Sequence, residues 1–395
     1  MKYKTYTMED VLETIIDYRG KTPKKSELGI PTLSAKTVRN NFIDYNNCYY
    51  ISEEEYKRFM VRGFPKVGDI LLTTEAPLGM TAKLDRADVA LAQRLLTLRG
   101  KSDILDNNYL LYFLQSPKGQ HLLKSHETGT TVTGIKQAVF RKLEISVPPI
   151  TVQKQIAAIL SSIDEKITTN TKIDENLEQQ AQALSDKWVA EHLDYITMRP
   201  LAEVAEINPD TYSPKDKWAF VNYLDTSSIT NGVMSEIQLI RPDTEKLPSR
   251  ARRIIKANDI VYSTVRPNQL HFGIISNPLD NMLASTGFAV IRSKYDYISS
   301  PYIYHFLISP DFIEKMQQLA EQSTSTFPSV KPSDIGTCLI PCADEAEMLD
   351  ITDKINGMYA LVSANHQENK RLAALRDTLL PKLMNGEIDV SAVKI

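Results

Sequence analysis

The sequence predicts an α+β fold in which one unit, a mixed α/β domain followed by a long helix, occurs twice. Two observations support this prediction. Four short sequence blocks recur in the same order at an offset of about 190–195 residues, and each set of blocks is followed by a long heptad pattern. Each heptad helix must bury an apolar stripe, and its duplicate offers a matching one. We therefore expect the two helices to form an antiparallel coiled coil.

The four blocks keep their order in both halves of the chain. The first shares an Asp-Ile pair, a threonine and a proline between its copies, and the second has the pattern Tyr-x-x-x-Phe-Leu-x-Ser-Pro. The third is a Thr/Ser-rich loop, and the fourth is a short apolar run that reaches a proline. The paired blocks are residues 67–77 and 257–267, 109–117 and 302–310, 128–133 and 323–328, and 145–148 and 338–341. Four blocks in one order indicate a duplication.

The repeat and the heptads divide the chain into four segments. The expected boundaries are a first globular domain at 1–150, a first long helix at 151–195, a second globular domain at 196–344 and a second long helix at 345–395. Short apolar runs between turn residues predict strands in both globular domains, and longer periodic stretches predict helices. The order in which the strands pair does not follow from the sequence.

Each long helix carries a seam of mostly apolar positions at alternating steps of four and three, with a polar break near its middle. The expected seam residues are Ile156, Leu160, Ile163, Ile167, Asn170, Leu177, Leu184, Ile351, Ile355, Met358, Val362, Asn365, Leu372 and Leu379. Asn170 and Asn365 fall at equivalent places near the centre, where a buried Asn sets register at some cost in stability. If they meet, replacing both with Leu raises thermal stability. The alternative is that each helix packs on its own globular domain.

Charge is unevenly distributed along the chain. The formal net charge is −3, yet residues 1–150 hold 22 basic and 17 acidic side chains, which gives that segment a net charge of +5. A protein that held nucleic acid mainly by neutralising phosphates would be more basic than this. If the chain binds DNA, we expect a partner to supply much of the non-specific attraction.

Other composition features point away from membranes, disulfides and metals. No stretch approaches the length of a membrane span, and the N-terminus lacks a signal-peptide pattern. Three cysteines at irregular spacing, Cys48, Cys338 and Cys342, indicate a reducing compartment and a cytoplasmic protein. Cys338 and Cys342 could be read as half of a zinc site, but no second pair lies nearby. We expect no metal site.

Catalytic motifs are absent from the sequence. Gly20-Lys21-Thr22 imitates the end of a phosphate-binding loop, but the glycine that should open such a loop is Ile15. Neither Asn208-Pro209-Asp210 nor Asn277-Pro278-Leu279 supplies the Asn/Asp-Pro-Pro-aromatic loop of an adenine methyltransferase. We therefore expect no catalytic residue in this chain.

Two motifs resemble a known family. The first runs from the loop at Thr128 through Leu143-Glu-Ile-Ser-Val-Pro-Pro149 into Gln153-Lys-Gln-Ile-Ala-Ala-Ile-Leu160. The second is the C-terminal Leu375-Arg-Asp-Thr-Leu-Leu-Pro-Lys-Leu-Met-Asn-Gly386. Both resemble the specificity subunit of type I restriction–modification systems. The likeness covers the whole chain as recognition domain, helix, recognition domain, helix, although Val265-Arg-Pro-Asn-Gln269 departs from the small turn of the first repeat.

This resemblance implies a role and partners. Such subunits are non-catalytic, and each recognition domain reads one half of a split sequence in double-stranded DNA while the helices set the gap. Two methyltransferase subunits and translocase–nuclease subunits join them, and S-adenosylmethionine, ATP and Mg²⁺ are expected on those partners. Because the two repeats have diverged in their loops, we expect an asymmetric target.

Reading a base requires Arg, Lys, Asn, Gln, Ser or Thr on loops that reach groove edges. We expect the lysines to contact phosphates more than bases, and any single lysine is otherwise an ordinary surface charge. The candidate DNA-binding residues are Lys21, Lys24, Lys25, Lys36, Arg39, Arg94, Thr130, Thr131, Lys136, Arg250, Arg252, Arg253, Arg266, Asn268, Gln269, His271, Ser325, Thr326 and Lys331.

Two other classes of function remain open at this point. A nuclease or methyltransferase with cryptic motifs would be active as the purified chain alone. A protein-binding scaffold would show no sequence-selective DNA binding even with its partners. Within the favoured class, a system that cuts on both sides of its site and an orphan methylation complex are indistinguishable, because they differ in partner subunits.

Overall fold

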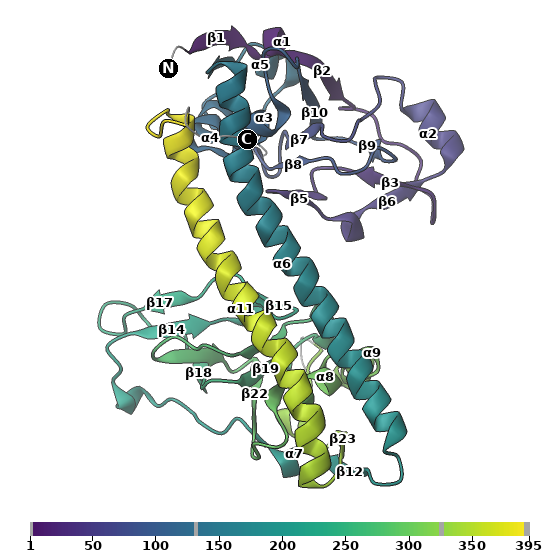
Figure 1. The fold of residues 1–395 in the computed structure, drawn as a ribbon, viewed down its shortest axis with the longest axis vertical. Helices are drawn as coiled ribbons and strands as arrows, with labels where there is room; N and C mark the ends of the chain where they lie inside the picture. Colours follow the sequence, from purple (N-terminus) through teal and green to yellow (C-terminus); the bar gives the residue numbers. More distant parts are fainter. Residues whose placement is uncertain (1–2, 130–132, 324–327, 391–395) are drawn as a thin grey trace. The chain divides into compact units, whose positions relative to one another are not determined.

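The computed structural model describes residues 3–129, 133–323 and 328–390 (Figure 1). The chain forms two compact units, which we describe separately. The first contains residues 1–169 and 368–395, and the second contains residues 170–367. The two long helices, α6 (Ile150–Glu191) and α11 (Glu345–Met384), each contribute one part to each unit. Each unit is therefore one globular domain with a segment of both helices.

The globular domain of the first unit alternates short strands and short helices. Its elements are β1 (Lys4–Thr7), α1 (Met8–Val11), β2 (Leu12–Asp17), β3 (Ile30–Leu33), β4 (Val38–Arg39), β5 (Phe42–Ile43), η1 (Tyr45–Asn47), β6 (Tyr49–Ile51), α2 (Glu53–Phe59), β7 (Ile70–Thr73), β8 (Thr81–Lys83), β9 (Ala90–Leu91), β10 (Leu95–Gly100), α3 (Asn107–Gln115), α4 (Pro117–Lys124), α5 (Gln137–Arg141) and β11 (Glu144–Val147).

The domain of the second unit has the same overall order with more strands. Its elements are β12 (Thr197–Pro200), α7 (Leu201–Val204), β13 (Ala205–Ile207), η2 (Pro214–Asp216), β14 (Val221–Leu224), η3 (Thr226–Ser228), β15 (Ile229–Thr230), β16 (Val233–Met234), β17 (Gln238–Ile240), β18 (Ala251–Ile254), β19 (Asp259–Ser263), η4 (Pro267–Gln269), β20 (Phe272–Ile275), β21 (Met282–Ser285), β22 (Phe288–Ser293), α8 (Ser300–Leu307), α9 (Pro310–Glu321), α10 (Pro332–Gly336) and β23 (Leu339–Cys342).

The sheet topology repeats between the units. The sheet ordered β2-β10-β7-β8 in the first unit corresponds to β13-β22-β19-β20 in the second. The two-stranded sheet β1-β11 corresponds to β12-β23, and the parallel pair β3 and β9 corresponds to β14 and β21. The second unit adds β18 beside β21. The predicted α+β fold with internal duplication is confirmed.

The shared sequence blocks have local structural causes. In the Ser-Pro block, the side chains of Ser116 and Ser309 accept backbone N–H groups at the starts of α4 and α9, and each proline occupies the first turn. A serine N-cap followed by proline satisfies the free amides of a helix start and presets its backbone angle. This block therefore ends one helix and begins the next in both units.

The Asp-Ile block places a buried carboxylate at the start of the central strand. Asp69 accepts the backbone N–H of Lys66 at 2.8 Å and Asp259 accepts that of Lys256 at 2.8 Å, which closes the same turn twice. The turn needs a residue with positive φ just before each aspartate. Gly68 (φ 89°) and Asn258 (φ 64°) supply it, and both are residue types that tolerate this region.

Each of these aspartates also holds an arginine on the neighbouring strand. Arg99 on β10 binds Asp69 through Nε and Nη2, both at 2.7 Å, and Arg292 on β22 binds Asp259 in the same way at 2.7 Å. Asp69 is 1% exposed and Asp259 is fully buried. A fork of two charge-assisted hydrogen bonds is the geometry that makes burial of a carboxylate tolerable. It ties the two central strands together in each unit.

The helices pack against each other and against a globular domain in each unit. In the first unit, Ile156 and Leu160 of α6 share a core with Leu383 of α11 and with α3. In the second, Trp188 of α6 lies in one core with Ile351 of α11. Early residues of α6 thus meet late residues of α11, and late residues meet early ones. The predicted antiparallel coiled coil is confirmed, and packing on the domains accompanies it.

Removing the buried carboxylate of Asp259 tests how much its ion pair with Arg292 contributes to stability. Asp259→Ala removes the bidentate partner of Arg292, whose side chain is 20% exposed and keeps its ion pair with Asp210, so the expected cost is about 1–3 kcal/mol. Calorimetric or chemical unfolding of the purified chain measures the effect on the transition of the second unit. Asp350→Ala, which removes an exposed partner of Lys354 in the same unit, is the control and should change stability little. Equal losses of stability in the two variants would show that the buried aspartate–arginine pair contributes no more than an exposed ion pair.

Candidate nucleic-acid interface

The loops predicted to contact DNA converge at one end of the central strand in each unit. In the first unit, the N–H of Thr74 donates to the carbonyl of Arg94 at 3.0 Å, and the N–H of Ile135 donates to the carbonyl of Thr74 at 2.9 Å. We call Thr74, Arg94 and Ile135 the first strand-end site. Gly134, which follows the Thr/Ser-rich loop in the chain, forms a bridge with Glu75 next to this site.

The second unit builds the same arrangement. The N–H of Thr264 donates to the carbonyl of Gly287 at 2.8 Å, and the N–H of Val330 donates to the carbonyl of Thr264 at 2.9 Å. Thr264, Gly287 and Val330 form the second strand-end site, and Val265 bridges Ser329 where Glu75 bridges Gly134. Each loop before the end of a domain is therefore attached to the end of the central strand.

The turn that follows the first strand-end site is held from several sides. Thr73 donates its hydroxyl to the carbonyl of Pro77 at 2.6 Å and accepts the N–H of Met80 at 2.9 Å. Gln120 on α4 donates to the carbonyl of Gly79 at 2.9 Å, and its amide fills the space a β-carbon at Gly79 would need. These contacts hold the turn in one conformation.

The corresponding turn in the second unit has a different shape. It forms the short helix η4, with Arg266 and Leu270 on its flanks at positive φ. The backbone N–H of Asn268 donates to Gln317 on α9 at 3.3 Å. The departure from the small turn of the first repeat therefore corresponds to a different local structure.

The first domain exposes most of its candidate DNA-binding residues. Arg94 lies in the first strand-end site, where its Nε is 2.7 Å from the Glu75 carboxylate, and Lys136 directly precedes α5. Lys25 lies with its ammonium 4.8 Å from the centre of the Tyr49 ring. The exposed candidates are Lys21, Lys24, Lys25, Lys36, Arg94 and Lys136, and Arg39 is half-buried. Only Arg94 and Lys136 adjoin the strand-end site directly.

The second domain carries its candidates on and just before β18, in and around η4, and directly before α10. His271 contacts the carbonyl of Ile229 at 2.7 Å and the Thr230 hydroxyl at 3.1 Å, so its ring is held in place. Burial lowers the pKa of Arg253, which makes it a less accessible cation than its neighbour Arg250. The exposed candidates are Arg250, Arg266, Asn268, Gln269 and Lys331, and the half-buried ones are Arg252, Arg253 and His271.

Four candidates lie outside the described residues. They are Thr130, Thr131, Ser325 and Thr326. The residues that follow these positions in the chain are described, and they lie beside the strand-end sites.

Some residues that shape the site were not predicted from the sequence. Arg19 donates to the hydroxyl of Thr74 at 3.2 Å and to the carbonyl of Ile135 at 3.1 Å, so it joins the strand end to the incoming loop. Arg99 and Arg292 hold each central strand to its neighbour at the opposite end of the sheet. A signal for these two existed, since each arginine ends an apolar run at a matching place after the duplicated aspartate. No comparable pattern marks Arg19.

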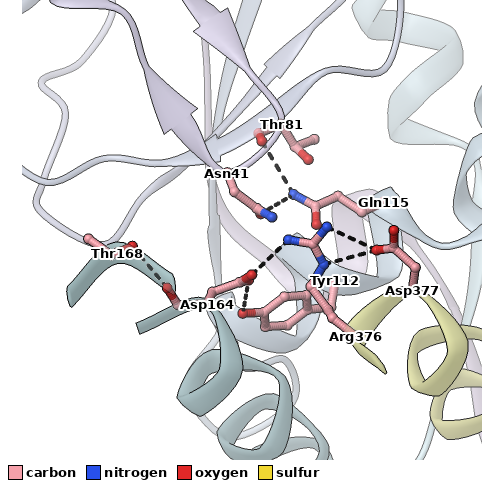
Figure 2. Close-up of polar contacts among 8 residues, drawn as sticks. All are labelled: Asn41, Thr81, Tyr112, Gln115, Asp164, Thr168, Arg376 and Asp377. Atoms are coloured by element: carbon pink, nitrogen blue, oxygen red, sulfur yellow. Dashed lines mark hydrogen bonds and ion pairs between the residues drawn. The ribbon is translucent and has the colours of Figure 1, made fainter. Parts of the chain in front are cut away.

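The paired helices of the first unit are joined to the domain by a buried polar network (Figure 2). Asp164 of α6 accepts the Tyr112 hydroxyl at 2.7 Å and an Nη of Arg376 from α11 at 2.8 Å. Arg376 also binds Asp377 on its own helix. Three elements, α3, α6 and α11, thus meet at one carboxylate, as Figure 2 shows. This contact holds the first domain against both helices.

The second unit places different groups in its helix pair. Asn365 of α11 donates to Asp174 of α6 at 2.6 Å, and His366 lies 3.6 Å from the same carboxylate. The partner of Asn365 is therefore one helical turn along α6 from Asn170. Burial raises the pKa of Asp174, and burial together with Asp174 and Glu175 raises the pKa of Glu178 to about 7.

The predicted seam positions all face inward. The fully buried ones are Ile156, Leu160, Ile163, Asn170, Ile351, Ile355 and Val362, and the half-buried ones are Ile167, Leu177, Leu184, Met358, Asn365, Leu372 and Leu379. An amphipathic helix that buried its stripe on a domain alone would leave part of this set exposed. The inward orientation is consistent with the antiparallel pairing of the helices.

The described part of the chain offers neither a metal-binding cluster nor a membrane-spanning helix. It contains no group of three or more His, Cys, Asp or Glu side chains placed to hold a metal ion. Within the same residues, no helix has the length and apolar character required to cross a membrane.

The fold and the repeated strand-end sites define a duplicated protein with two similar domains, and comparisons with known proteins show what it resembles. Residues 1–179 match the type I restriction modification DNA specificity domain. The chain is 23% identical to the putative MjaX specificity subunit of Methanocaldococcus jannaschii, covering 97% of this chain and 93% of that one. It is 26% identical to the HindI specificity subunit of Haemophilus influenzae over 40% of this chain, a match that spans only 34% of that subunit.

A solved structure shares the fold. The type I restriction–modification S subunit from M. genitalium superimposes with a TM-score of 0.59 at 15% identity, covering 97% of this chain and 96% of that one. The chain is therefore similar to type I restriction–modification specificity subunits, through the family model over residues 1–179 and through the MjaX subunit over nearly its whole length.

The contact between Asn365 and Asp174 predicts the effect of one substitution. Asn365→Leu removes the donor to a carboxylate that is 5% exposed, and an unpaired buried acceptor is expected to cost about 1–3 kcal/mol. Asp174→Leu combined with Asn365→Leu replaces both partners with apolar groups and should recover most of that loss. Thermal unfolding of the single and double variants provides the measurement. A single variant as stable as the parent would show that this hydrogen bond contributes nothing.

Buried His305 predicts a dependence of stability on pH. It is 1% exposed, neither ring nitrogen has a hydrogen-bond partner among the described residues, and it packs against Tyr359 of α11. Burial lowers the pKa of His305 to about 4 from 6.5, so the folded state excludes a proton that the unfolded state binds. The histidine's contribution is intact above pH 6.5 and falls as pH drops toward 4, by about 2 kcal/mol at pH 5.

His305→Phe should remove this part of the acid sensitivity. Unfolding free energies at pH 7 and pH 5 are compared for the parent, for His305→Phe and for the exposed control His121→Phe. Glu178 acts in the opposite direction, since its raised pKa favours the folded state as pH falls, and it is unchanged in every variant. If His305→Phe and the parent lost the same stability between the two pH values, the buried neutral ring would not be the cause.

Proposed function

We propose that this chain reads a bipartite, asymmetric sequence in double-stranded DNA and directs methylation and cleavage by partner subunits. Each globular domain would read one half-site with the loops at its strand-end site. The chain itself would be non-catalytic, as the likeness to specificity subunits suggests.

The observation that supports this proposal is the repeated strand-end site with different side chains. The backbone hydrogen bonds at Thr74 and at Thr264 are the same, whereas the turns that follow differ in sequence and shape. A conserved frame with divergent loops is expected when two copies of one reader recognise different bases. Two identical half-sites would need no such divergence.

The charge of this chain indicates that partner subunits would share in binding DNA. The net charge is −3, and the basic excess of +5 in residues 1–150 is small. Non-specific affinity for DNA depends on phosphate neutralisation. Two methyltransferase subunits would supply much of that attraction and would bind S-adenosylmethionine. Translocase–nuclease subunits would bind ATP and Mg²⁺.

Deleting the gene tests the proposal directly. Modified-base sequencing of the source genome, with and without the gene, is expected to show a split asymmetric motif that loses its methylated adenines on deletion. Reintroducing the gene should restore the motif. An unchanged methylation pattern alongside an expressed gene would contradict the proposed role.

Exchanging one domain tests the assignment of half-sites. Replacing residues 196–344 with the equivalent domain of another family member should alter one half of the motif and leave the other intact. The control is the reciprocal exchange of residues 1–150, which should alter only the other half. Simultaneous change of both halves would show that the domains do not read independently.

A further inference from the structure

We infer that Arg94 and Arg250 are equivalent base-reading arginines, each recognising a guanine in its own half-site. This inference rests on the proposed function and adds a residue and a base to it. The two arginines occupy different places in the sequence repeat, so their equivalence depends on the three-dimensional structure.

The position of Arg94 in the first repeat corresponds to that of Gly287 in the second. Arg94 and Gly287 directly precede β10 and β22, and those strands begin with the same register, Leu95 opposite Thr73 and Phe288 opposite Ser263. The carbonyls of Arg94 and Gly287 accept the N–H groups of Thr74 and Thr264. A side chain at this position emerges beside the loop attached to the strand end.

Arg250 compensates for the missing side chain at Gly287. An Nη of Arg250 lies 3.0 Å from the point where a β-carbon of Gly287 would stand. The carbonyl of Arg250 accepts the N–H of Thr286, which fixes its backbone next to this site. The guanidinium therefore comes from the segment before β18 instead of from the loop itself. Both strand-end sites thus have an exposed arginine at the position that directly precedes β10 and β22.

Arg94 is prepared for a directional contact. Its Nε is 2.7 Å from a carboxylate oxygen of Glu75, and Glu75 is itself anchored through its bridge to Gly134. An ion pair at Nε orients the guanidinium plane and leaves the two terminal nitrogens for a ligand. The Arg94 side chain is 49% exposed, so those nitrogens are accessible. A phosphate contact would not need this orientation, whereas recognition of a base edge does.

Guanine is the base that such a group recognises. Its major-groove edge presents two acceptors, O6 and N7, at the spacing of two guanidinium N–H groups. Adenine, cytosine and thymine present at least one donor or methyl group there, or a single acceptor, and so cannot accept both hydrogen bonds. Lysine bears a point charge on a flexible stem and reads this edge less strictly.

The test uses the complex of this chain with its modification subunits, bound to DNA pools randomised in one half-site at a time. Arg94→Ala should lose the preference for guanine at one base pair of one half-site, and Arg250→Ala at one base pair of the other. The expected loss of discrimination is roughly 5- to 150-fold at that position. All other positions of the motif should stay unchanged.

Two exposed arginines at the far ends of the same sheets serve as matched controls. Arg86 follows β8, whose Lys83 pairs with Ile70 at the start of β7, and it is in an ion pair with Asp88. Arg241 follows β17, whose Ile240 pairs with Val221 at the start of β14. Arg86→Ala and Arg241→Ala remove the same charge and should leave base preference intact.

Salt dependence separates base reading from phosphate binding. A uniform loss of affinity for all sequences in Arg94→Ala or Arg250→Ala, with a shallower dependence on salt, would identify a phosphate contact and overturn the inference. Unchanged guanine preference would overturn it as well. If an alanine variant fails to assemble, the lysine variant decides. Arg94→Lys keeps the charge and should lower guanine preference without changing the salt dependence, and full retention of preference would overturn the bidentate contact.

The same experiment distinguishes this inference from the function on which it rests. A wild-type complex without any sequence preference would overturn the proposed function. A wild-type complex with a split motif, whose preference is the same in the arginine variants and in their controls, would overturn the inference alone.

Discussion

The bidentate pair between a buried aspartate and an arginine on the adjacent strand supports the rest of each domain. Asp69 with Arg99, and Asp259 with Arg292, join the central strand to its neighbour at one end of the sheet. Burying a carboxylate is unfavourable unless its lone pairs are satisfied, and here two guanidinium hydrogen bonds and a backbone amide satisfy them. With that end of the sheet held, the opposite end presents loops that can vary without loss of the frame. The loops proposed to read DNA occupy this free end.

The two units solve the contact between domain and helices with different chemistry. In the first, one carboxylate at Asp164 joins Tyr112 and Arg376 in a charged network. In the second, the aromatic ring of Tyr359 packs against a neutral, buried His305. A charged network is directional and keeps its strength across neutral pH, whereas a buried neutral histidine weakens as pH falls. The duplicated frame has therefore diverged at its helix contacts as well as in its loops.

The proposed division of work follows from what each part can do physically. Rigid strand-end loops with oriented donors suit base reading, because discrimination needs donors held in place. A weakly charged surface suits a subunit that relies on partners for attraction to phosphates. In the proposal, this chain supplies the sequence information and the reactive chemistry belongs to the subunits that join it.

The sequence by itself determined the duplication, the two long helices and the general nature of the fold, since heptad steps and repeated Ser-Pro and Asp-Ile blocks are local patterns with local physical causes. The inward orientation of Leu160 or Ile351 follows from helical periodicity alone. Only the tertiary structure decided which polar groups meet, because such partners are distant in the chain. Asn365 binds Asp174, Arg19 reaches Thr74, and Arg250 lies over Gly287 for this reason. A repeat in sequence aligns positions, but a guanidinium delivered from another segment restores an equivalent group only in three dimensions.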